Sequence, residues 1–536
     1  MNITYPVGDA SFGSIRQQGR VYVDKTDLIY RLVAEGNFYF LSRPRRFGKS
    51  LLVSTLEAYF TAKRELFAGL AMEQLEREWV QYPVLRIDFA QGDYSIPDTL
   101  ETVISFMLTE WETLYGVSAD SQTLITRFMG VIRRAHAQTG QRVVVLVDEY
   151  DKPMLDAWGN ADLMTENQKI LRGFYGVLKS SMEHLRFVFL TGITKFAHLN
   201  VFSGLNNLKD ISMDMRYATL CGISEKELRD NFAIGVEQLA SQNSQTIDEA
   251  YAKLKEQYDG YRFSPYSTEQ LYNPFSLLWV LDARCYGSYW YESGTANFLY
   301  KKVIDRDEPL EDLTDVEMLE SELWGRDPDQ IGLVSLLYQT GYLTINSYDP
   351  AQGLFTLRFP NREVWQAFYL GLEKELFKSD INRGLSVVAF CKFIRAGQVE
   401  TLMANMYTFL AGNDYRIAGD REVYFQNAMV IIFRLLGFMT HAEYATSNGR
   451  IDAVVETPTY ISLFEFKYGH SAQEAMTQIE EKHYAARYAQ DSRQLYKLGV
   501  GFSQETCTIE DCIIRSEGQE DLRMSVREGR LVAVGE

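Results

Sequence analysis

The chain has 536 residues, a formal net charge of −18, and 46% hydrophobic and 13% aromatic side chains. This length predicts about three domains with packed cores, and the acidic balance argues for a soluble protein that does not coat nucleic acid non-specifically. Five scattered cysteines without a C-x-x-C pair, and only six histidines, argue against a disulfide framework or a zinc site and favour a reducing cytosol.

Residues 1–225 are predicted to alternate between strands and helices. The first residues show neither the basic segment nor the apolar core of a signal peptide. Apolar runs predict strands at 37–41, 84–89, 143–147 and 187–190. Helical periodicity lies between them, at 50–61, 97–115, 122–137 and 165–182. This alternation predicts a P-loop type of doubly wound parallel sheet in an α/β domain.

Residues 43–51, Arg-Pro-Arg-Arg-Phe-Gly-Lys-Ser-Leu, contain the end of a phosphate-binding P-loop between a strand and a helix. In such a loop the backbone N–H groups wrap the phosphates, the lysine neutralises charge, and the hydroxyl ligates Mg²⁺. The match is imperfect because Arg43 stands where the pattern has its first glycine, so a solvated basic turn is the alternative. We expect ATP and Mg²⁺ to be bound by Arg45, Arg46, Phe47, Gly48, Lys49, Ser50 and Leu51.

Two further strand ends favour a nucleotide site. The run at 143–147 leads into Asp148, which would hold Mg²⁺, and Glu149, which would orient or deprotonate the attacking water. A helix cap is the alternative reading of this acidic pair. The strand at 187–190 ends in Thr191, predicted to sense the γ-phosphate, with Thr194 as the reserve candidate.

The middle of the chain predicts a lid and a linker. Residues 226–300 are mostly helical in pattern, and a helix, a glycine break and a hairpin follow at 331–359. Together they predict a helical and winged-helix-like lid over 226–370. Residues 371–410 form a helical linker, and a new α/β unit is expected over 411–536. The longest apolar run, 428–439, is too short to span a bilayer and is predicted to be a core helix, so no membrane partner is expected.

The C-terminal unit is predicted to hold a second site on a hairpin. Asp452 opens one strand, and the partner strand carries Glu465 and Lys467 on one face. Two carboxylates that bind Mg²⁺ (or Mn²⁺), beside a lysine that stabilises the transition state, form a phosphodiesterase site. A cross-strand salt bridge on a solvated face is the alternative. We expect a helix at 472–489, with Ala486 among its buried residues, and a completing acid at Glu422 or Glu443.

Together these motifs resemble bacterial proteins that join an AAA-ATPase-like domain to a C-terminal PD-(D/E)XK nuclease-superfamily domain. The similarity extends over nearly the whole chain. It rests on segments 22–26 (YVDKT), 43–50 (RPRRFGKS), 147–153 (VDEYDKP), 191–195 (TGITK), 258–263 (YDGYRF), 449–452 (GRID) and 465–467 (EFK). The resemblance implies a P-loop ATPase core, a winged-helix-like lid and a restriction-endonuclease-like C-terminal fold. It also implies that Arg43 is normal for the family and that Gln478 and Tyr484 belong to the nuclease motif.

The sequence therefore predicts an ATP-hydrolysing protein that gates a metal-dependent nuclease, with DNA as the favoured partner and the cytoplasm as its location. Work in mobile-element or phage defence fits the resemblance. One alternative is a signalling switch whose nuclease-like domain is a non-catalytic docking module, and another is a scaffold that binds nucleotide without turnover. Arg216 is one candidate for an arginine finger, and because such residues often act in trans, a homo-oligomer is suspected.

Overall fold

The computed structural model describes residues 4–117, 122–195, 207–292, 299–300, 303, 313, 315–324, 332–376, 390, 392–411, 432, 452–506 and 508–534. The chain divides into two compact units. The first comprises residues 1–294 and 313–365, and the second comprises residues 295–312 and 366–536. The finer divisions at 225, 370 and 410 remain predictions.

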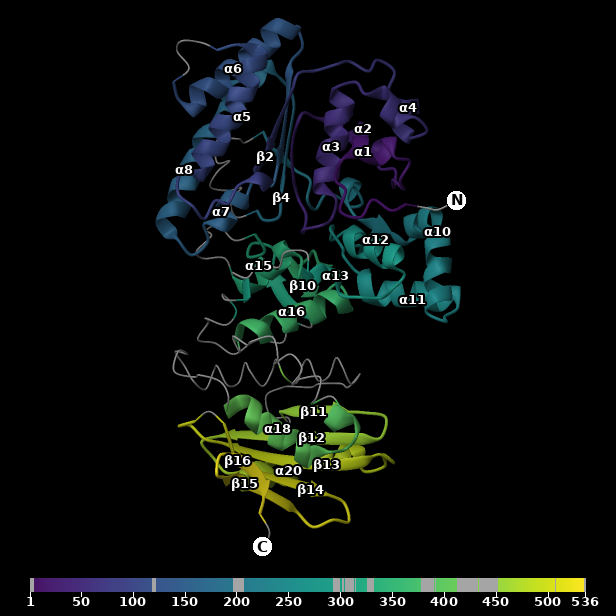
Figure 1. The fold of residues 1–536 in the computed structure, drawn as a ribbon, viewed down its shortest axis with the longest axis vertical. Helices are drawn as coiled ribbons and strands as arrows, with labels where there is room; N and C mark the ends of the chain where they lie inside the picture. The colour runs from purple at the N-terminus through teal and green to yellow at the C-terminus, as the bar shows by residue number, and fades with distance from the viewer. Residues whose placement is uncertain are drawn as a thin grey trace. The chain divides into compact units, whose positions relative to one another are not determined.

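A five-stranded parallel sheet forms the centre of the first unit (Figure 1). Its strands are β1 (Phe38–Ser42), β2 (Val84–Asp88), β3 (Val143–Asp148), β4 (Leu185–Gly192) and β5 (Lys209–Asp210), in the order β2-β3-β4-β1-β5. Every residue of β3 is buried, as expected of a strand covered on both faces. Strand β4 lies between β1 and β3 and pairs in parallel with both, so the carboxyl ends of all three strands lie at one edge of the sheet.

Helices cover both faces of this sheet, which confirms the predicted doubly wound α/β fold. Figure 1 shows α5, α6 and α8 on one side and α1 to α4 on the other. The helices are α1 (Phe12–Gln17), α2 (Thr26–Glu35), α3 (Lys49–Phe60), α4 (Ala71–Leu75), α5 (Thr99–Tyr115), α6 (Leu124–Thr139), α7 (Lys152–Asp156) and α8 (Ala161–Ser180). Short 3₁₀ turns are η1 (Arg64–Phe67), η2 (Phe89–Gln91), η3 (Met182–His184) and η4 (Met215–Tyr217).

A helical subdomain follows, and the sequence signals its helix starts. The helices are α10 (Glu225–Gln242), α11 (Ile247–Tyr258), α12 (Pro274–Ala283) and α13 (Tyr289–Glu292), with a small ribbon of β6 (Ile223–Ser224) and β7 (Leu271–Tyr272). Capping boxes at Ser224 and Thr246 begin α10 and α11. Asn273 caps α12 and is followed by Pro274 at the first helical position.

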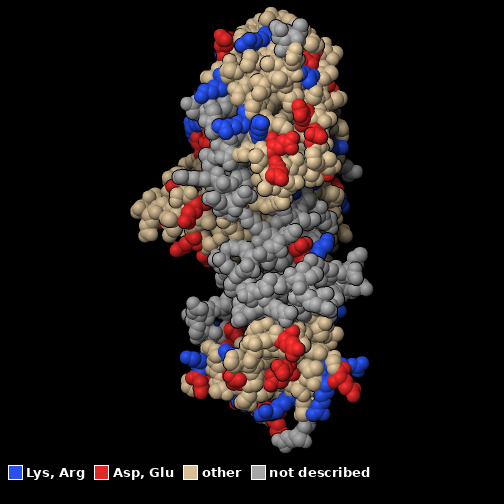
Figure 2. All heavy atoms as spheres, turned by 90° about the vertical axis from the view of Figure 1, so that its left-hand side faces the viewer, with Lys and Arg blue, Asp and Glu red and all other residues tan. Residues whose placement is uncertain are grey.

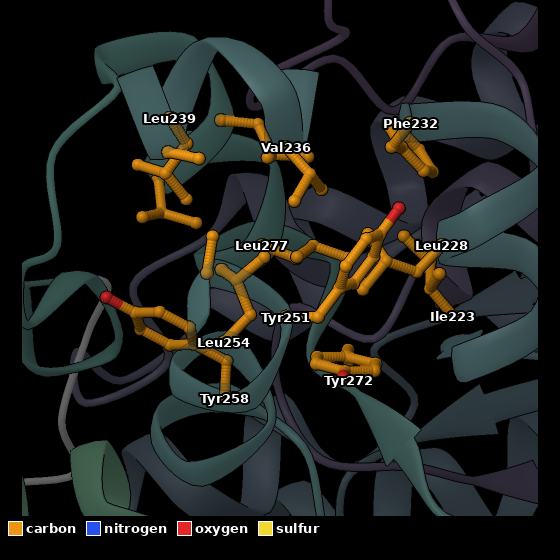
Figure 3. Close-up of a cluster of buried hydrophobic side chains, with 14 of the residues drawn as sticks. Ile223, Leu228, Phe232, Val236, Leu239, Tyr251, Leu254, Tyr258, Tyr272 and Leu277 are labelled. Carbon is orange, nitrogen blue, oxygen red and sulfur yellow. The ribbon is translucent and has the colours of Figure 1, made fainter. Parts of the chain in front are cut away.

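The core of this subdomain is aromatic and aliphatic (Figure 3). Phe232 and Leu239 of α10, Leu254 of α11 and Leu277 of α12 converge there. Tyr5, from the start of the chain, packs against Phe232 with ring centroids 5.8 Å apart. The N-terminal segment is therefore held by the helical subdomain within the first unit.

The winged-helix-like element predicted over 331–359 is present. Helix α15 (Leu333–Thr340) ends at Gly341 and is followed by β9 (Thr344–Asp349) and β10 (Leu354–Arg358). With β8 (Val316–Leu319) they form an antiparallel sheet in the order β8-β10-β9. Helix α16 (Arg362–Leu376) follows.

The second unit is built on a six-stranded mixed sheet in the order β11-β12-β13-β14-β15-β16. Its strands are β11 (Ala453–Glu456), β12 (Tyr460–Tyr468), β13 (Gln494–Phe502), β14 (Ile509–Ser516), β15 (Leu522–Arg527) and β16 (Arg530–Ala533). Only β12 and β13 of these neighbours pair in parallel. Helix α18 (Val399–Ala411) contacts β14 and β16, and α20 (Ala472–Glu481) connects β12 to β13.

Helix α20 is shorter than the predicted 472–489. It ends at Glu481, His483 adopts a left-handed conformation with φ of 51°, and η7 (Tyr484–Tyr488) follows. Because the chain turns there, Ala486 is exposed and Tyr488 is buried instead, so the expected burial of Ala486 is wrong. At Gly499 a Cβ would come within 2.6 Å of the Ala472 carbonyl oxygen, so glycine lets α20 lie close to β13.

Among the described residues, no helix combines the length and apolar character needed to cross a membrane. The core helix predicted at 428–439 lies outside the described residues apart from Ile432, which is buried.

Candidate nucleotide and nuclease sites

The phosphate loop joins β1 to α3 at the carboxyl edge of the sheet. Gly48 has a φ of 89° and precedes the first residue of α3, Lys49. The N-terminal N–H groups of α3 and its dipole therefore face the loop, together with the Ser50 hydroxyl one residue later. This is the strand, loop and helix arrangement that the motif requires.

Lys49 is held inside the loop. Its side chain is 3% exposed. Its ammonium nitrogen donates to the carbonyl oxygens of Arg43 and Pro44, each at 3.2 Å, and lies 3.9 Å from Glu149 Oε1. These carbonyl bonds are long, so a phosphate oxygen would be a stronger partner for this cation.

Two carboxylates lie at the end of β3, as predicted. Asp148 is 1% exposed and hydrogen-bonds with Ser50. Burial raises the pKa of Asp148 to about 6, with the nearby Glu149 adding to the rise. Glu149 has a φ of 53°, a strained conformation for this residue type. A hydroxyl beside a buried carboxylate is a set of oxygen ligands that suits Mg²⁺.

A third carboxylate stands at the same edge, which the sequence analysis did not single out. Asp88 ends β2, and the parallel register places it opposite Asp148. Its charge contributes to the raised pKa of Asp148. The sequence signal that could have identified Asp88 is its position as a carboxylate at the end of a strand that neighbours β3.

The phosphate loop and Glu149 line one cleft. Its walls come from the phosphate loop, the N-terminal segment, the end of β3 and helix α12. Contributing residues include Gly8, Arg45, Arg46, Lys49, Ser50, Leu51, Glu149, Lys152, Phe275 and Leu278. The cleft combines cationic, polar and apolar walls, which suit a small ligand that carries phosphate groups.

The second site lies at the β11–β12 hairpin. The antiparallel register pairs Ala453 with Phe464, which places Asp452 opposite Glu465. Asp452 Oδ2 accepts the Phe466 N–H at 2.7 Å. Glu465 is 1% exposed, and its Oε2 has no hydrogen-bond partner among the described residues. Glu465 is therefore buried, unlike a residue of a solvated salt bridge, whereas Asp452 and Lys467 are half-buried.

Burial and mutual repulsion disfavour ionisation of Glu465 beside Asp452, although Lys467 partly offsets this. Burial raises the pKa of Glu465 to about 7, and the charge of Asp452 raises it further. Burial also raises the pKa of Asp452. An unsatisfied buried carboxylate oxygen beside a second carboxylate fits the ligand set of a divalent metal.

Lys467 completes the predicted trio. Its ammonium nitrogen donates to Glu465 Oε1 at 3.3 Å and to Gln478 Oε1 at 2.6 Å. The Gln478 amide in turn donates to the Tyr484 hydroxyl at 3.3 Å. The two residues that the resemblance attached to the nuclease motif therefore lie in one hydrogen-bond chain with the lysine.

Comparisons with known proteins agree with this geometry. A family model described as a predicted AAA-ATPase matches residues 6–202, and one described as the PD-(D/E)XK nuclease superfamily matches residues 420–512. An uncharacterized protein in the vnfD 5' region of Azotobacter chroococcum mcd 1 is 34% identical over 524 residues, which is 96% of this chain and 99% of that protein. The chain belongs to this family of AAA-ATPase-like proteins with a C-terminal PD-(D/E)XK nuclease-superfamily domain.

The AAA-ATPase-like loop uses Arg43 in a way that a glycine could not. Arg43 is buried, and its guanidinium donates to the carbonyl oxygens of Ser212 and Tyr217. It also lies 4.2 Å from the ring centroid of Phe263. Burial lowers the pKa of Arg43. Arg43 therefore anchors the loop to the segments that carry Ser212, Tyr217 and Phe263, on the side of the loop away from the cleft.

Phe47 is likewise an anchor. Its ring packs edge-on against Tyr261 and Phe263, at centroid distances of 4.6 and 5.0 Å. The side chain is buried, so the backbone of Phe47, and not its ring, would be the part available to a bound phosphate. The segment 258–263 thus holds both Arg43 and Phe47, which explains why it accompanies the P-loop.

Thr191 and Thr194 are both buried at the end of β4. The Thr191 hydroxyl donates to the Leu41 carbonyl at 2.8 Å, and the Thr194 hydroxyl donates to Asp151 Oδ2 at 2.6 Å. Asp151 also accepts the N–H groups of Ile193 and Thr194. Asp151, which was not predicted from the sequence as a site residue, therefore links the segment after β3 to the segment after β4.

Three further candidate residues were predicted from the sequence: Arg216, Glu422 and Glu443. Arg216 is partly exposed and pairs with Asp214 at 2.6 Å and Glu35 at 2.8 Å. Glu422 and Glu443 lie outside the described residues. Within the described part of the chain, no group of three or more His, Cys, Asp or Glu residues converges as a metal site.

Proposed function

We propose that this protein binds and hydrolyses ATP in its AAA-ATPase-like unit and cleaves DNA with a metal ion in its PD-(D/E)XK unit. The proposal rests chiefly on one observation: the buried Glu465 carboxylate lies opposite the half-buried Asp452 and 3.3 Å from the Lys467 ammonium. A chain that also carries a P-loop cleft combines both chemistries.

In the nucleotide cleft, the backbone from Arg45 to Leu51 would wrap the phosphates, and Lys49 would exchange its loop carbonyls for phosphate oxygens. Ser50 and Asp148 would hold Mg²⁺, which neutralises phosphate charge when bound. Glu149 would accept the proton of the attacking water. Thr191 would respond to the γ-phosphate through its contact with the end of β1.

In the nuclease site, Asp452 and Glu465 would hold Mg²⁺ or Mn²⁺, and the unsatisfied Glu465 Oε2 fits this role. The bound ion would polarise the scissile phosphate and lower the pKa of a water. Lys467, oriented by Gln478, would stabilise negative charge on the phosphate in the transition state. Glu422 or Glu443 would add the remaining carboxylate.

A local surface must bind the nucleic acid, because the chain as a whole is acidic. On the face drawn in Figure 2, Lys and Arg are interspersed with Asp and Glu. We propose that nucleotide binding changes the exposure or assembly of the nuclease unit, which would suit a role in mobile-element or phage defence. A homo-oligomer is part of this proposal.

The first test is cleavage of supercoiled and linear DNA with Mg²⁺ or Mn²⁺, with and without ATP. Metal-dependent cutting that Asp452→Ala abolishes, and that the exposed control Glu481→Gln retains, is the expected result. An effect of ATP on the rate would demonstrate coupling. Calorimetric titration with Mn²⁺ should detect a site in the wild type that Asp452→Ala lacks.

The second candidate is a nucleotide switch with a non-catalytic docking module. The closed contact between Lys467 and Glu465 favours it, because the lysine ammonium can neutralise this carboxylate in place of a metal ion. Failure to cut any DNA, together with no affinity for Mn²⁺, in protein that still hydrolyses ATP would select this candidate.

A further inference from the structure

Arg46 occupies a strained position inside the phosphate loop. Its φ is 67°, in the left-handed region that glycine adopts without steric cost. The loop nevertheless places a long cationic side chain there, and that side chain is exposed. Strain at a ligand-binding loop is a reason to ask what the strained residue contributes.

The Arg46 guanidinium lies over the ring of Phe275 in α12, 4.6 Å from its centroid. Both residues line the nucleotide cleft, together with Lys49, Ser50 and Glu149. Arg46 is thus stacked on an apolar wall of the same cleft that the triphosphate would enter. A stacked guanidinium can move to a phosphate oxygen without crossing a packed core.

The charge in this cleft also favours an anion. Arg45, Arg46 and Lys49 line it on the loop side, and Glu149 faces Lys49. Partial burial and the nearby Arg45 lower the pKa of Arg46. Repulsion between neighbouring cations would be relieved when a polyanion binds between them.

We propose that Arg46 is a catalytic arginine that acts within its own subunit. When ATP binds, the Arg46 guanidinium moves away from the ring of Phe275 and binds the γ-phosphate. This inference rests on the proposed ATPase function. In the step, the water oxygen bonds to the γ-phosphorus while the bond to the β–γ bridging oxygen breaks. ADP and inorganic phosphate result, and Glu149 accepts the water proton. Arg46 stabilises the charge on the transferred phosphoryl group.

The other arginines near the loop are placed for different tasks. Arg43 is buried against main-chain carbonyl groups beneath the loop. Arg216, the candidate from the sequence, is engaged by Asp214 and Glu35. Arg46 precedes Gly48 by two residues, so its side chain starts beside the backbone that would hold the phosphates.

The test compares Arg46→Gly, Arg46→Lys and wild type for binding of a fluorescent ATP analogue and for single-turnover hydrolysis. Arg46→Gly removes the guanidinium and relieves the backbone strain, so we expect unchanged or higher thermal stability and affinity within about threefold of wild type. Hydrolysis should fall about 100-fold or more, and Arg46→Lys should recover part of it. Lys179→Ala, at an exposed site ending α8, should behave as wild type.

A mixing experiment separates action within a subunit from action across subunits. Arg46→Gly is combined with Lys49→Ala, which keeps Arg46 but should not bind ATP. If Arg46 acts within its own subunit, the mixture stays inactive. Restored hydrolysis would overturn the proposal, as would Arg46→Gly turning over at the wild-type rate. Failure of the wild type to bind ATP would instead overturn the proposed ATPase function, and this inference with it.

Discussion

Gly341, at the end of α15, lies against Pro44 in the phosphate loop. A Cβ on Gly341 would come within 2.5 Å of the Pro44 Cβ, and the Gly341 carbonyl accepts the Tyr261 hydroxyl at 3.0 Å. The winged-helix-like element therefore rests on the loop that would bind ATP.

Gly341→Ala should destabilise the first unit by about 2–4 kcal/mol, because it adds a steric clash to an unfavourable backbone conformation. Gly341 has a φ of 87°. Gly353→Ala is a matched control, since Gly353 has a φ of 63° and no atom within 4 Å of its Cβ position. That control should lose about 1 kcal/mol. Urea unfolding measures both, and equal losses would argue against a tight Pro44 contact.

Glu149→Gln should bind ATP at least as tightly as wild type but hydrolyse it about 10²–10⁴-fold more slowly. The amide cannot accept the water proton, and removing the carboxylate leaves Lys49, 3.9 Å away, more available to phosphate. Single-turnover assays with radiolabelled ATP would measure this. Glu183→Gln, at an exposed site, is the control. An unchanged rate would show that Glu149 is not the base, and absence of hydrolysis by both wild type and variant would favour a scaffold that binds nucleotide without turnover.

Gln478→Ala should slow metal-dependent DNA cleavage by about 10–100-fold, as expected for loss of a group that orients a site residue. The reason is loss of the 2.6 Å bond that orients Lys467. Gln478→Glu keeps a carbonyl acceptor and should recover much of the rate, which a purely structural defect would not allow. Thr477→Ala, exposed on the same helix, should cut normally. Cleavage time courses at saturating Mn²⁺ distinguish these variants.

Glu363 should make the stability of the first unit depend on pH. Burial raises the pKa of Glu363 to about 7 from an ordinary value of 4.5, and the carboxyl accepts the backbone N–H of Trp290 at 2.8 Å. The folded state therefore binds this proton more tightly. The stabilisation is complete below pH 4.5 and is lost as the pH rises through 7.

Glu363→Gln keeps an acceptor for Trp290 without the ionisation. At pH 8 it should be more stable than wild type by about 1–3 kcal/mol, and at pH 4 the difference should vanish. Denaturant unfolding at the two pH values measures this. A difference that is equal at both would show that ionisation of Glu363 is not the cause.

The residues of both candidate sites could be predicted from the sequence because they cluster at strand ends. The apolar composition of residues 143–147 predicted a buried strand, and Asp148 and Glu149 follow at its end. Alternation along β12 placed Glu465 and Lys467 on one face, and the hairpin register brought Asp452 opposite Glu465. Local periodicity is sufficient for such assignments, since strand direction and pleat determine where side chains point.

Contacts between distant segments could not be read in this way. The burial of Arg43 against Ser212 and the edge-on packing of Phe47 on Tyr261 depend on chain segments about 170 and 214 residues away. The early end of α20 and the exposure of Ala486 also escaped prediction, because the left-handed His483 interrupts an otherwise helical pattern.

The sequence by itself predicted the two domain families, the order of strands and helices along the chain, and the acidic and basic residues expected at each site. Tertiary structure decided which of those side chains are buried anchors, which line the cleft, and which lie without a partner. Arg43 and Arg46 belong to the same loop, yet one lies buried beneath it and the other faces the cleft. The physical reason is that desolvation and charge pairing depend on what packs around a residue, which one-dimensional patterns do not encode.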